Sequence, residues 1–284
     1  MMQILDGKAT AKKIREELKC EIENRKSIDS TFELTLSVIL VGNDPASEVY
    51  VNNKIKACKN VGIKSVLVRL DAEVQESEII SKIEELNEDK SVDGILLQLP
   101  LPKGFDEDKI INHINPLKDV DGLTYLQQGK MYGGAEALTP CTPSGVIRLL
   151  KEYDVQMKGK NAVVIGRSIL VGKPLFNLLL NENATVTLCH SRTTDLSAHT
   201  KNADIICVAV GRAGMLKADM VKEGAVVVDI GINRTENGLK GDVDFEEVSK
   251  KASFITPVPG GVGPMTRACL MENTLECFLR KMEK

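Results

Sequence analysis

The hydrophobic positions of this chain alternate between short continuous runs and longer stretches with helical spacing. Continuous runs at 34–41 and 94–99 predict buried strands, whereas Ile79, Ile83 and Leu86 share one side of a helix predicted over 76–88. Strands that alternate with helices indicate parallel sheets and an α/β fold. The same reasoning predicts further strands at 64–70, 161–166, 185–189, 204–210, 225–230 and 254–256, and further helices at 8–24, 45–61 and 265–281.

A break in this pattern near 138–145 divides the chain. Prolines interrupt the segment there, and Thr142-Pro143 can start a new helix before a second α/β series begins at Asn161. A length of 284 residues also suggests two domains. We therefore predict two α/β domains with parallel sheets, residues 1–138 and 139–265, with a C-terminal helix over 266–284 that packs back on the first domain.

Composition supports buried parallel strands and narrows the possible partners. Aromatic residues make up 4% of the chain and Trp is absent, so the cores must be built from Val, Ile and Leu. A net charge of −3 without a long basic run argues against a nucleic-acid partner. No apolar run is long enough to span a membrane, and the first eight residues lack the apolar core of a signal peptide. We expect a cytoplasmic protein with no membrane partner.

Cysteine and histidine spacing predicts neither disulfides nor a metal site. The seven cysteines are scattered, odd in number and form no C-x-x-C, which is typical of reduced thiols in the cytosol. The three histidines lack metal-site spacing with the cysteines, so we expect no metal.

The helix predicted over 45–61 carries a candidate reactive pair. Asp44 suits the N-cap, Pro45 the first helical position and Gly62 the left-handed residue after the helix. Tyr50 and Lys54 are four residues apart and so share a face. An amine near an aromatic ring could act on a flat, carbonyl-like or imine-like substrate. A solvated lysine beside a half-buried tyrosine is the alternative.

Gln98 is a second candidate because it closes the strand at 94–99. Ligands of parallel α/β sheets bind beyond the carboxyl ends of the strands, which places the Gln98 amide where a ligand is expected. An ordinary polar residue at a strand end is an equal alternative.

A nucleotide site is predicted at the start of the second domain. The strand at 161–165 leads through Gly166, Arg167 and Ser168 into a helix start, the order that a dinucleotide-binding turn requires. Ser168 and Val171 occupy the second and third glycine positions of the usual motif, so a structural turn competes with this interpretation.

The next strand indicates which dinucleotide would bind. It continues into His190, Ser191, Arg192 and Thr193 without the acid that usually binds the ribose hydroxyls of NAD. Hydroxyls and a guanidinium suit a 2′-phosphate, so NADP is favoured over NAD. A surface loop that happens to carry Arg192 is the alternative.

Six motifs in order resemble those of the bifunctional methylenetetrahydrofolate dehydrogenase/methenyltetrahydrofolate cyclohydrolase family. They are Tyr50-Val51-x-x-Lys54, Gly94-Ile95-Leu96-Leu97-Gln98-Leu99-Pro100-Leu101-Pro102, Lys118-Asp119-Val120-Asp121-Gly122, Pro140-Cys141-Thr142-Pro143, Gly166-Arg167-Ser168, and the run from Pro257 to Thr266. The resemblance implies NADP-dependent oxidation of 5,10-methylenetetrahydrofolate and hydrolysis of the methenyl product to 10-formyltetrahydrofolate. It also implies a homodimer and an active-site cleft between a folate-binding catalytic domain, 1–138, and a Rossmann-type NADP-binding domain, 139–265.

The resemblance also implies roles for individual residues. Lys54 resembles the family's catalytic lysine, Tyr50 its folate-stacking tyrosine, Gln98 the glutamine that holds the lysine and Asp121 the carboxylate that grips the pterin. Gly166, Arg167, Ser168, Ser191 and Ile232 resemble the NADP contacts, beside Arg192 and Thr193. Pro259, Gly260, Gly261, Val262 and Gly263 resemble a loop that closes over the substrate.

Several alternatives stay open. Asp121-Gly122 is also a frequent turn dipeptide, and the glycines of 259–263 could serve a tight turn. The family usually continues after Asp-Gly with Phe-His-Pro and an Asn, whereas Leu123–Gln128 stand here, which leaves the shape of the folate pocket open. A monofunctional NADP-dependent dehydrogenase or a non-catalytic nucleotide-binding regulator would lack the hydrolytic step that Lys54 and Gln98 favour.

Overall fold

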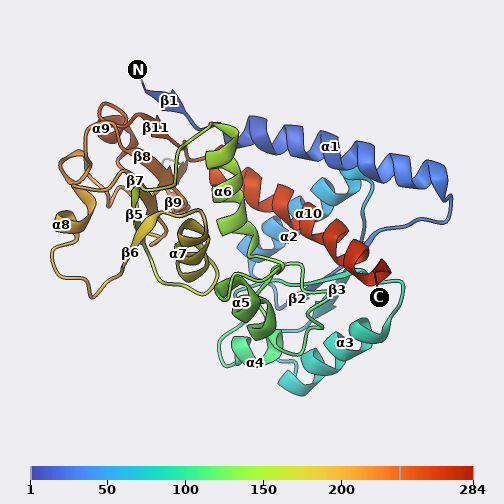
Figure 1. Ribbon diagram of the computed structural model, residues 1–284. Helices are drawn as coiled ribbons and strands as arrows, with labels where there is room; N and C mark the ends of the chain where they lie inside the picture. Colours follow the sequence, from blue (N-terminus) through green and yellow to red (C-terminus); the bar gives the residue numbers. More distant parts are fainter. Residues whose placement is uncertain (1, 237, 284) are drawn as a thin grey trace. The chain divides into compact units, whose positions relative to one another are not determined.

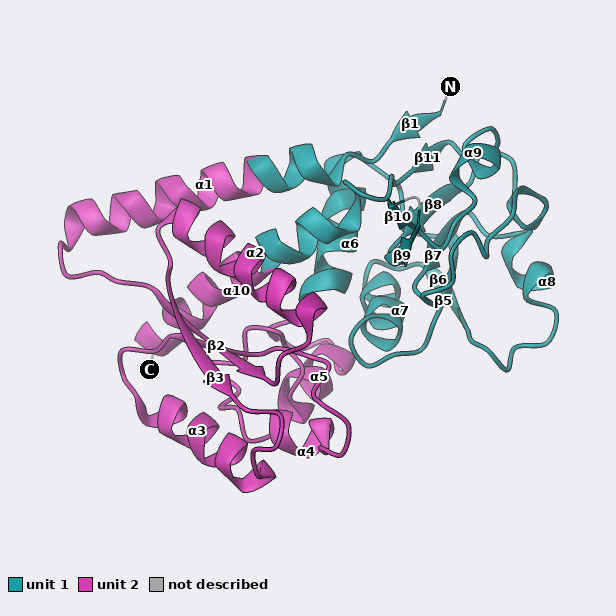
Figure 2. Cartoon of the chain, turned by 180° about the vertical axis from the view of Figure 1, so that it is seen from behind, with its two compact units in different colours: residues 1–12, 140–269 teal, residues 13–139, 270–284 magenta. Residues whose placement is uncertain are grey.

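The computed structural model describes residues 2–236 and 238–283 (Figure 1). Met1 and Lys284, the ends of the segments predicted as 1–138 and 266–284, lie outside the described residues. The chain forms two compact units, which Figure 2 colours separately. Unit 1 comprises 1–12 and 140–269, and unit 2 comprises 13–139 and 270–284. The structure thus groups residues 1–12 with the later half of the chain, whereas the sequence placed them in the first domain.

Unit 2 contains a three-stranded parallel sheet in the order β3-β2-β4. The strands are β2 (Thr35–Val41), β3 (Lys64–Leu70) and β4 (Gly94–Leu97). The central strand β2 is buried along its whole length, because it is paired on both edges and covered on both faces. The helices between and after the strands are α2 (Pro45–Val61), α3 (Glu76–Glu88), α4 (Glu107–Ile111) and α5 (Tyr125–Tyr132).

The ends of α2 confirm the capping signals read from the sequence. The Asp44 carboxylate accepts a hydrogen bond from the Ser47 amide at 2.8 Å, and Pro45 is the first helical residue. Gly62 ends the helix with φ +89°, a conformation that residues with a side chain adopt at a cost. These two caps fix the length of α2 and so the position of Tyr50 and Lys54 along it.

Unit 1 contains a six-stranded sheet in the order β1-β11-β8-β7-β5-β6, and every pair in it is parallel. Its strands are β1 (Gln3–Ile4), β5 (Asn161–Ile165), β6 (Thr185–Cys189), β7 (Ile205–Val208), β8 (Val226–Asp229) and β11 (Phe254–Ile255). After β6 the chain crosses back over β5 to form β7 on its other side. The carboxyl ends of β5 and β7 therefore form the switch point at which doubly wound sheets bind dinucleotides, and the predicted Rossmann-type sheet is confirmed.

Shorter elements complete unit 1. They are the helices α6 (Cys141–Glu152), α7 (Gly172–Asn181), α8 (Leu196–Thr200) and α9 (Phe245–Val248), the 3-10 helix η1 (Ala218–Met220), and the antiparallel pair β9 (Asn233–Thr235) and β10 (Gly238–Lys240). The sequence did not predict β1, β9 or β10.

Two long helices contain the division between the units, as Figure 2 shows. These are α1 (Gly7–Ile28) and α10 (Val262–Met282), both longer than the predicted 8–24 and 265–281. The second half of α10 belongs to unit 2, where the Asn273 amide donates to the carbonyls of Val120 and Thr139 at 2.8 and 3.1 Å. Of the helices in the described parts of the chain, none has both the length and the apolar character needed to cross a membrane.

Candidate functional site

Lys54 and Gln98 meet in unit 2, from α2 and the end of β4. The Lys54 Nζ donates a hydrogen bond to the Gln98 Oε1 at 3.0 Å. The Gln98 amide nitrogen in turn donates to the Leu99 carbonyl, so the amide oxygen is held toward the lysine. Gln98 is 7% exposed, which makes this amide a fixed support rather than a surface group. The pairing that the resemblance implies is therefore present as a direct contact.

Tyr50 lies one helical turn before Lys54 on α2 and is 41% exposed. Its ring is therefore accessible to a flat partner. A ring beside an amine on one helix face can stack on an aromatic ligand while the amine reaches a polar atom at its edge.

The segment before Asp121 is anchored by two buried charged residues. The Lys118 ammonium donates to the carbonyls of Leu86, Asn87 and Asp89 at 2.9, 2.7 and 2.7 Å, so it caps the end of α3. Burial lowers the pKa of Lys118. The neighbouring Asp119 carboxylate accepts from the Thr124 amide at 2.8 Å, and burial raises its pKa. Both side chains have structural roles.

Asp121 is half-buried and follows directly in a turn. The Gly122 amide donates to the Asp119 carbonyl at 3.2 Å, and Gly122 has φ +64°. A Cβ at Gly122 would lie 2.5 Å from the Leu138 carbonyl oxygen, so only glycine fits. The turn reading of Asp121-Gly122 is therefore correct, and it is compatible with a binding role for the Asp121 carboxylate.

The atypical segment Leu123–Gln128 folds into the start of α5. Thr124 caps this helix through a hydrogen bond from the Gln127 amide at 3.4 Å. The buried Gln127 side chain donates to the Pro116 carbonyl at 2.6 Å and accepts from the Leu138 amide at 2.9 Å. Gln127 thereby joins the two ends of the loop that carries Asp121, and the unusual residues keep that loop closed.

In unit 1, the turn after β5 is shaped by two glycines. Gly166 has φ +124°, and a Cβ there would lie 2.3 Å from the Ala209 carbonyl oxygen. A Cβ at Gly172 would lie 2.0 Å from the Gly166 carbonyl oxygen. Gly172 therefore allows the close helix–strand packing that the third glycine of the usual motif, here Val171, would allow. The Ser168 hydroxyl accepts from the amides of Val171 and Gly172 at 3.2 and 3.4 Å. The turn is thus a compact strand-to-helix connection of the dinucleotide-binding kind.

A second turn follows the adjacent strand β6. Ile165 pairs with Cys189, and the Gly166 amide donates to the Cys189 carbonyl at 2.9 Å, so the two turns begin side by side. The Thr193 hydroxyl accepts from the His190 amide at 2.8 Å and closes this turn. Ser191, Arg192 and Arg167 are exposed. This edge of the sheet therefore offers two guanidinium groups and a hydroxyl, and no acid follows β6 within the turn.

The segment 257–261 is a tight turn whose glycines pack against the start of the chain. Gly260 has φ +115°, and its carbonyl accepts from the Lys8 amide at 2.8 Å. A Cβ at Gly7 would lie 1.8 Å from the Gly261 carbonyl oxygen. Val262 and Gly263, predicted as part of a loop, instead form the first turn of α10. Ile232, 43% exposed, lies near this turn, since a Cβ at Gly263 would be 3.8 Å from its Cδ1.

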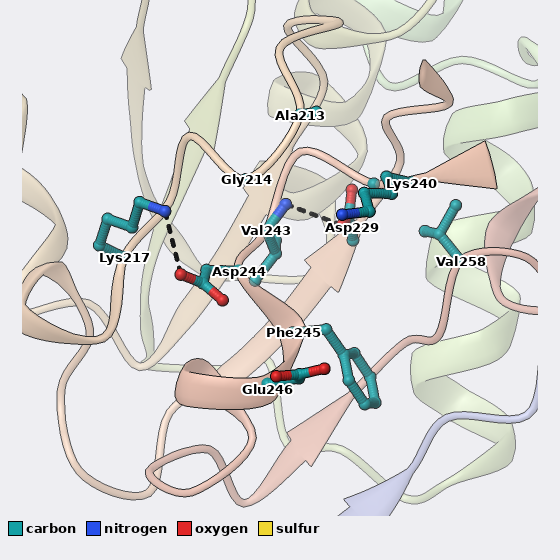
Figure 3. Close-up of a pocket in the computed structure, with 11 residues that line it drawn as sticks. Ala213, Gly214, Lys217, Asp229, Lys240, Val243, Asp244, Phe245, Glu246 and Val258 are labelled. Carbon is teal, nitrogen blue, oxygen red and sulfur yellow. Dashed lines mark hydrogen bonds and ion pairs between the residues drawn. The ribbon is translucent and has the colours of Figure 1, made fainter. Parts of the chain in front are cut away.

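A cavity of about 440 Å³ opens in unit 1 beside Asp229 (Figure 3). None of the predicted site residues lines it. The buried Asp229 carboxylate accepts from the amides of Gly231, Asp242 and Val243 at 3.0, 2.9 and 2.9 Å. Burial, with a smaller contribution from the nearby Asp242 carboxylate, raises the pKa of Asp229 to about 6. Sequence reasoning missed both acids, although an acid that ends the apolar run 225–230 was a usable signal.

The described residues contain no group of three or more His, Cys, Asp or Glu side chains that could hold a metal ion.

Comparison with known proteins agrees with this geometry. The model of the tetrahydrofolate dehydrogenase/cyclohydrolase catalytic domain matches residues 5–121, and that of the corresponding NAD(P)-binding domain matches residues 140–282. The bifunctional protein FolD of Campylobacter hominis is 55% identical over 284 residues, covering 100% of this chain and 99% of that protein.

Two solved structures are similar over the whole chain. The bifunctional methylenetetrahydrofolate dehydrogenase/cyclohydrolase FolD of Campylobacter jejuni has a TM-score of 0.97 at 51% identity and covers 99% of this chain and 100% of its own. The corresponding enzyme of Trypanosoma brucei, solved with NADP and an inhibitor, has a TM-score of 0.95 at 36% identity and covers 100% and 99%.

Proposed function

The chain belongs to the tetrahydrofolate dehydrogenase/cyclohydrolase family, and from this premise we propose how its side chains divide two reactions. The enzyme oxidises 5,10-methylenetetrahydrofolate with NADP and hydrolyses the 5,10-methenyl product to 10-formyltetrahydrofolate, two steps of tetrahydrofolate interconversion. The hydrogen bond between Lys54 and Gln98 is the observation that carries the assignment of residues.

The two reactions make different demands on Lys54. Oxidation removes a hydride from the methylene carbon and leaves a cationic methenyl group, so no proton has to move. Binding and orientation supply most of that step. In the hydrolysis, the attacking water loses a proton and a ring nitrogen gains one as the carbon–nitrogen bond breaks. Lys54, held in place by the Gln98 carbonyl, transfers this proton.

Tyr50 and Asp121 bind the folate. The exposed Tyr50 ring stacks on the flat substrate beside the reacting carbon. The Asp121 carboxylate pairs with the guanidine-like edge of the pterin through two parallel hydrogen bonds. The closed loop held by Gln127 supports this role, because it fixes the backbone around Asp121.

Unit 1 binds NADP, which supplies the hydride acceptor. The close packing of Gly166 and Gly172 fits a pyrophosphate at the start of α7, where backbone amides and the helix dipole favour an anion. Arg167, Ser191 and Arg192 bind the 2′-phosphate, with Ser168, Thr193 and Ile232 at the edge of the same site. Pro259, Gly260, Gly261, Val262 and Gly263 border the folate.

We further infer that the protein is a cytoplasmic homodimer. None of its seven cysteines forms a disulfide in the described residues, which is typical of a reducing compartment. Analytical ultracentrifugation of the purified protein tests the dimer, and a sedimentation mass near that of one chain at micromolar concentration would contradict it.

The assignment of Lys54 is tested by Lys54→Met. We expect cyclohydrolase activity to fall by roughly 10²–10⁴-fold, the usual value of positioned acid–base help, while dehydrogenase activity stays measurable and NADP binding stays normal. NADPH formation and the decay of the methenyl compound are followed in the same preparation. Lys56→Met, an exposed lysine on the same helix, is the matched control and should keep both activities. Hydrolysis at the original rate in Lys54→Met would show that Lys54 is only a surface lysine.

A further inference from the structure

A fully buried carboxylate, Asp242, lies at the centre of a cluster of hydrogen-bond donors in unit 1. Its Oδ2 accepts from the amides of Val210 and Gly211 at 2.7 and 3.0 Å. Its Oδ1 accepts from the Arg212 amide at 2.7 Å and from the Asn233 side-chain nitrogen at 2.9 Å. Four donors thus converge on one carboxylate, three of them consecutive backbone amides.

The first segment that Asp242 holds follows β7 and packs against the nucleotide turn after β5. The Ala209 amide donates to the Ile165 carbonyl at 2.8 Å, and the Ala209 carbonyl is the group against which Gly166 packs. Residues 210–212 come next. Their path therefore determines where the backbone that supports Gly166 leaves the sheet.

The second segment contains Ile232. Asn233 donates to Asp242, and a Cβ at Gly231 would lie 2.1 Å from the Asp242 carboxyl carbon. The residues on both sides of Ile232 are therefore packed on the same carboxylate. One acid fixes the segments after β7 and after β8, on the edge of the sheet where the dinucleotide is expected.

Asp229 holds Asp242 in place. It accepts from the backbone amides of Asp242 and Val243, and its Oδ2 lies 1.8 Å from the position of a Cβ at Gly241. This contact requires glycine before Asp242. The two acids therefore act in sequence: Asp229, at the end of β8, orients Asp242, and Asp242 orients the two segments after β7 and β8.

We propose that Asp242 is a positioning residue for NADP. It holds the backbone segments after β7 and after β8 in place beside the NADP site without touching the cofactor. This proposal rests on the NADP site described above. The four donors require a side chain with two acceptor oxygens, which an ionised carboxylate supplies. An asparagine at position 242 would replace one of these oxygens with an NH₂ group, which would point its hydrogens at one or more of the donors. Hydrogen bonds to a charged acceptor are strong, and a buried donor left without a partner is costly.

The test is Asp242→Asn, a change that keeps the size of the side chain. We expect the KM for NADP in the dehydrogenase reaction to rise about ten- to hundredfold, the effect of losing a hydrogen bond to a charged group. The kcat at saturating NADP should stay within about threefold, and hydrolysis of the methenyl compound, measured without NADP, should keep its rate. Thermal unfolding is recorded with and without NADP, and the variant should lose most of the shift that NADP gives the parent.

Asp244→Asn is the matched control. In the described residues, the interaction found for the Asp244 carboxylate is an ion pair at the surface, with the Lys217 ammonium at 3.0 Å. This variant should leave every readout unchanged. If Asp242→Asn does not fold, Asn233→Ala decides: removing one of the four donors should raise the KM for NADP severalfold with kcat unchanged.

An unchanged KM for NADP in a folded Asp242→Asn variant, or an equal loss of both activities, would overturn the proposal. If the NADP site itself is assigned wrongly, the result is different: replacing Arg167 and Arg192 would then also leave the KM for NADP unchanged.

Discussion

At the scale of single residues, glycine positions decide how the nucleotide turn is built. Close backbone contacts require glycine at both Gly166 and Gly172, although the sequence matches only part of the usual G-x-G-x-x-G motif. Ser168 and Val171 are tolerated because their positions leave room for a side chain. The specificity of this turn for one dinucleotide must then come from the side chains around it.

Arg167→Ala combined with Arg192→Ala should weaken NADP far more than NAD. Both guanidinium groups are exposed at neighbouring turns and no acid lies in the second turn, so a 2′-phosphate is attracted there. Each lost charge-assisted hydrogen bond costs about 1.5–3 kcal/mol, so the KM for NADP should rise by at least about tenfold, with little change for NAD. Initial rates with each cofactor measure this, and equal use of both by the unaltered enzyme would refute the assignment.

Sequence reasoning found residues at strand ends and helix faces, but not the buried acids. Tyr50 and Lys54 follow from helical spacing and Gln98 from its strand end, and the resemblance joined them. Asp229 and Asp242 stayed unnoticed because most of their partners are backbone amides, and those of Asp242 lie about 30 residues before it in the chain. Backbone donors carry no residue signature, so only the folded structure reveals Asp242, whereas the apolar run 225–230 offered a signal for Asp229 alone.

At the scale of elements, α2 and α3 were predicted to the residue, whereas α1 and α10 were predicted too short. Local capping residues mark both ends of α2, so its limits are encoded nearby. Three glycines lie within two residues of Val262, the start of α10, and such a cluster predicts a loop when the sequence is considered alone. The two-residue strand β1 forms only because β11 offers it an edge, and no local pattern can show that.

Two glycine-to-alanine changes should shift stability in opposite directions. Gly62→Ala forces a side chain into φ +89° at the end of α2, with the new Cβ 3.2 Å from Ile22, and should destabilise by about 1–2 kcal/mol. Gly129→Ala lies inside α5 with nothing within 4 Å of the new Cβ, and should stabilise by about 0.5–1 kcal/mol. Urea unfolding of both variants measures this. Effects of the same sign would mean that the helix ends are not as described.

At the scale of the whole molecule, the sequence predicted two α/β domains, but not how the chain is shared between the compact units. Alternating strands and helices are a local property, and they indicated the parallel sheets correctly. The grouping of residues 1–12 with unit 1 depends on β1 pairing with β11 and on Gly7 packing on Gly261. Contacts between segments this far apart leave no periodic signal.

Asp229 should make stability respond to pH in an unusual direction. Its folded pKa is about 6 against 3.8 for an ordinary Asp, so the folded state binds the proton more tightly. The contribution of this proton is complete below about pH 4 and is lost as the pH rises through 6. Lowering the pH from 7 to 5 should therefore stabilise the parent relative to Asp229→Asn. The difference between their free energies of unfolding should change by about 1 kcal/mol in favour of the parent.

Urea unfolding at pH 7, 6 and 5 measures this difference. Asp204→Asn is the control of opposite sign, because hydrogen bonds from Lys222 and from the Asn161 backbone lower the pKa of Asp204. Its contribution is lost only as the pH falls through that lowered value, so it should stay level between pH 7 and pH 5. A constant difference for Asp229→Asn across the series would show that its carboxyl is ionised throughout.

A ribosome makes residues 13–139 well before residues 270–284, although both belong to unit 2. At ordinary translation rates of about 5–20 residues per second, roughly seven to twenty-six seconds separate them. Through that interval the buried Asp93 lacks its ion-pair partner Lys281, and the carbonyls of Val120 and Thr139 lack the Asn273 amide. Unit 2, most of which is synthesised before residues 140–269 of unit 1, is therefore completed last, and premature termination near residue 269 would damage the half of the protein that was already synthesised.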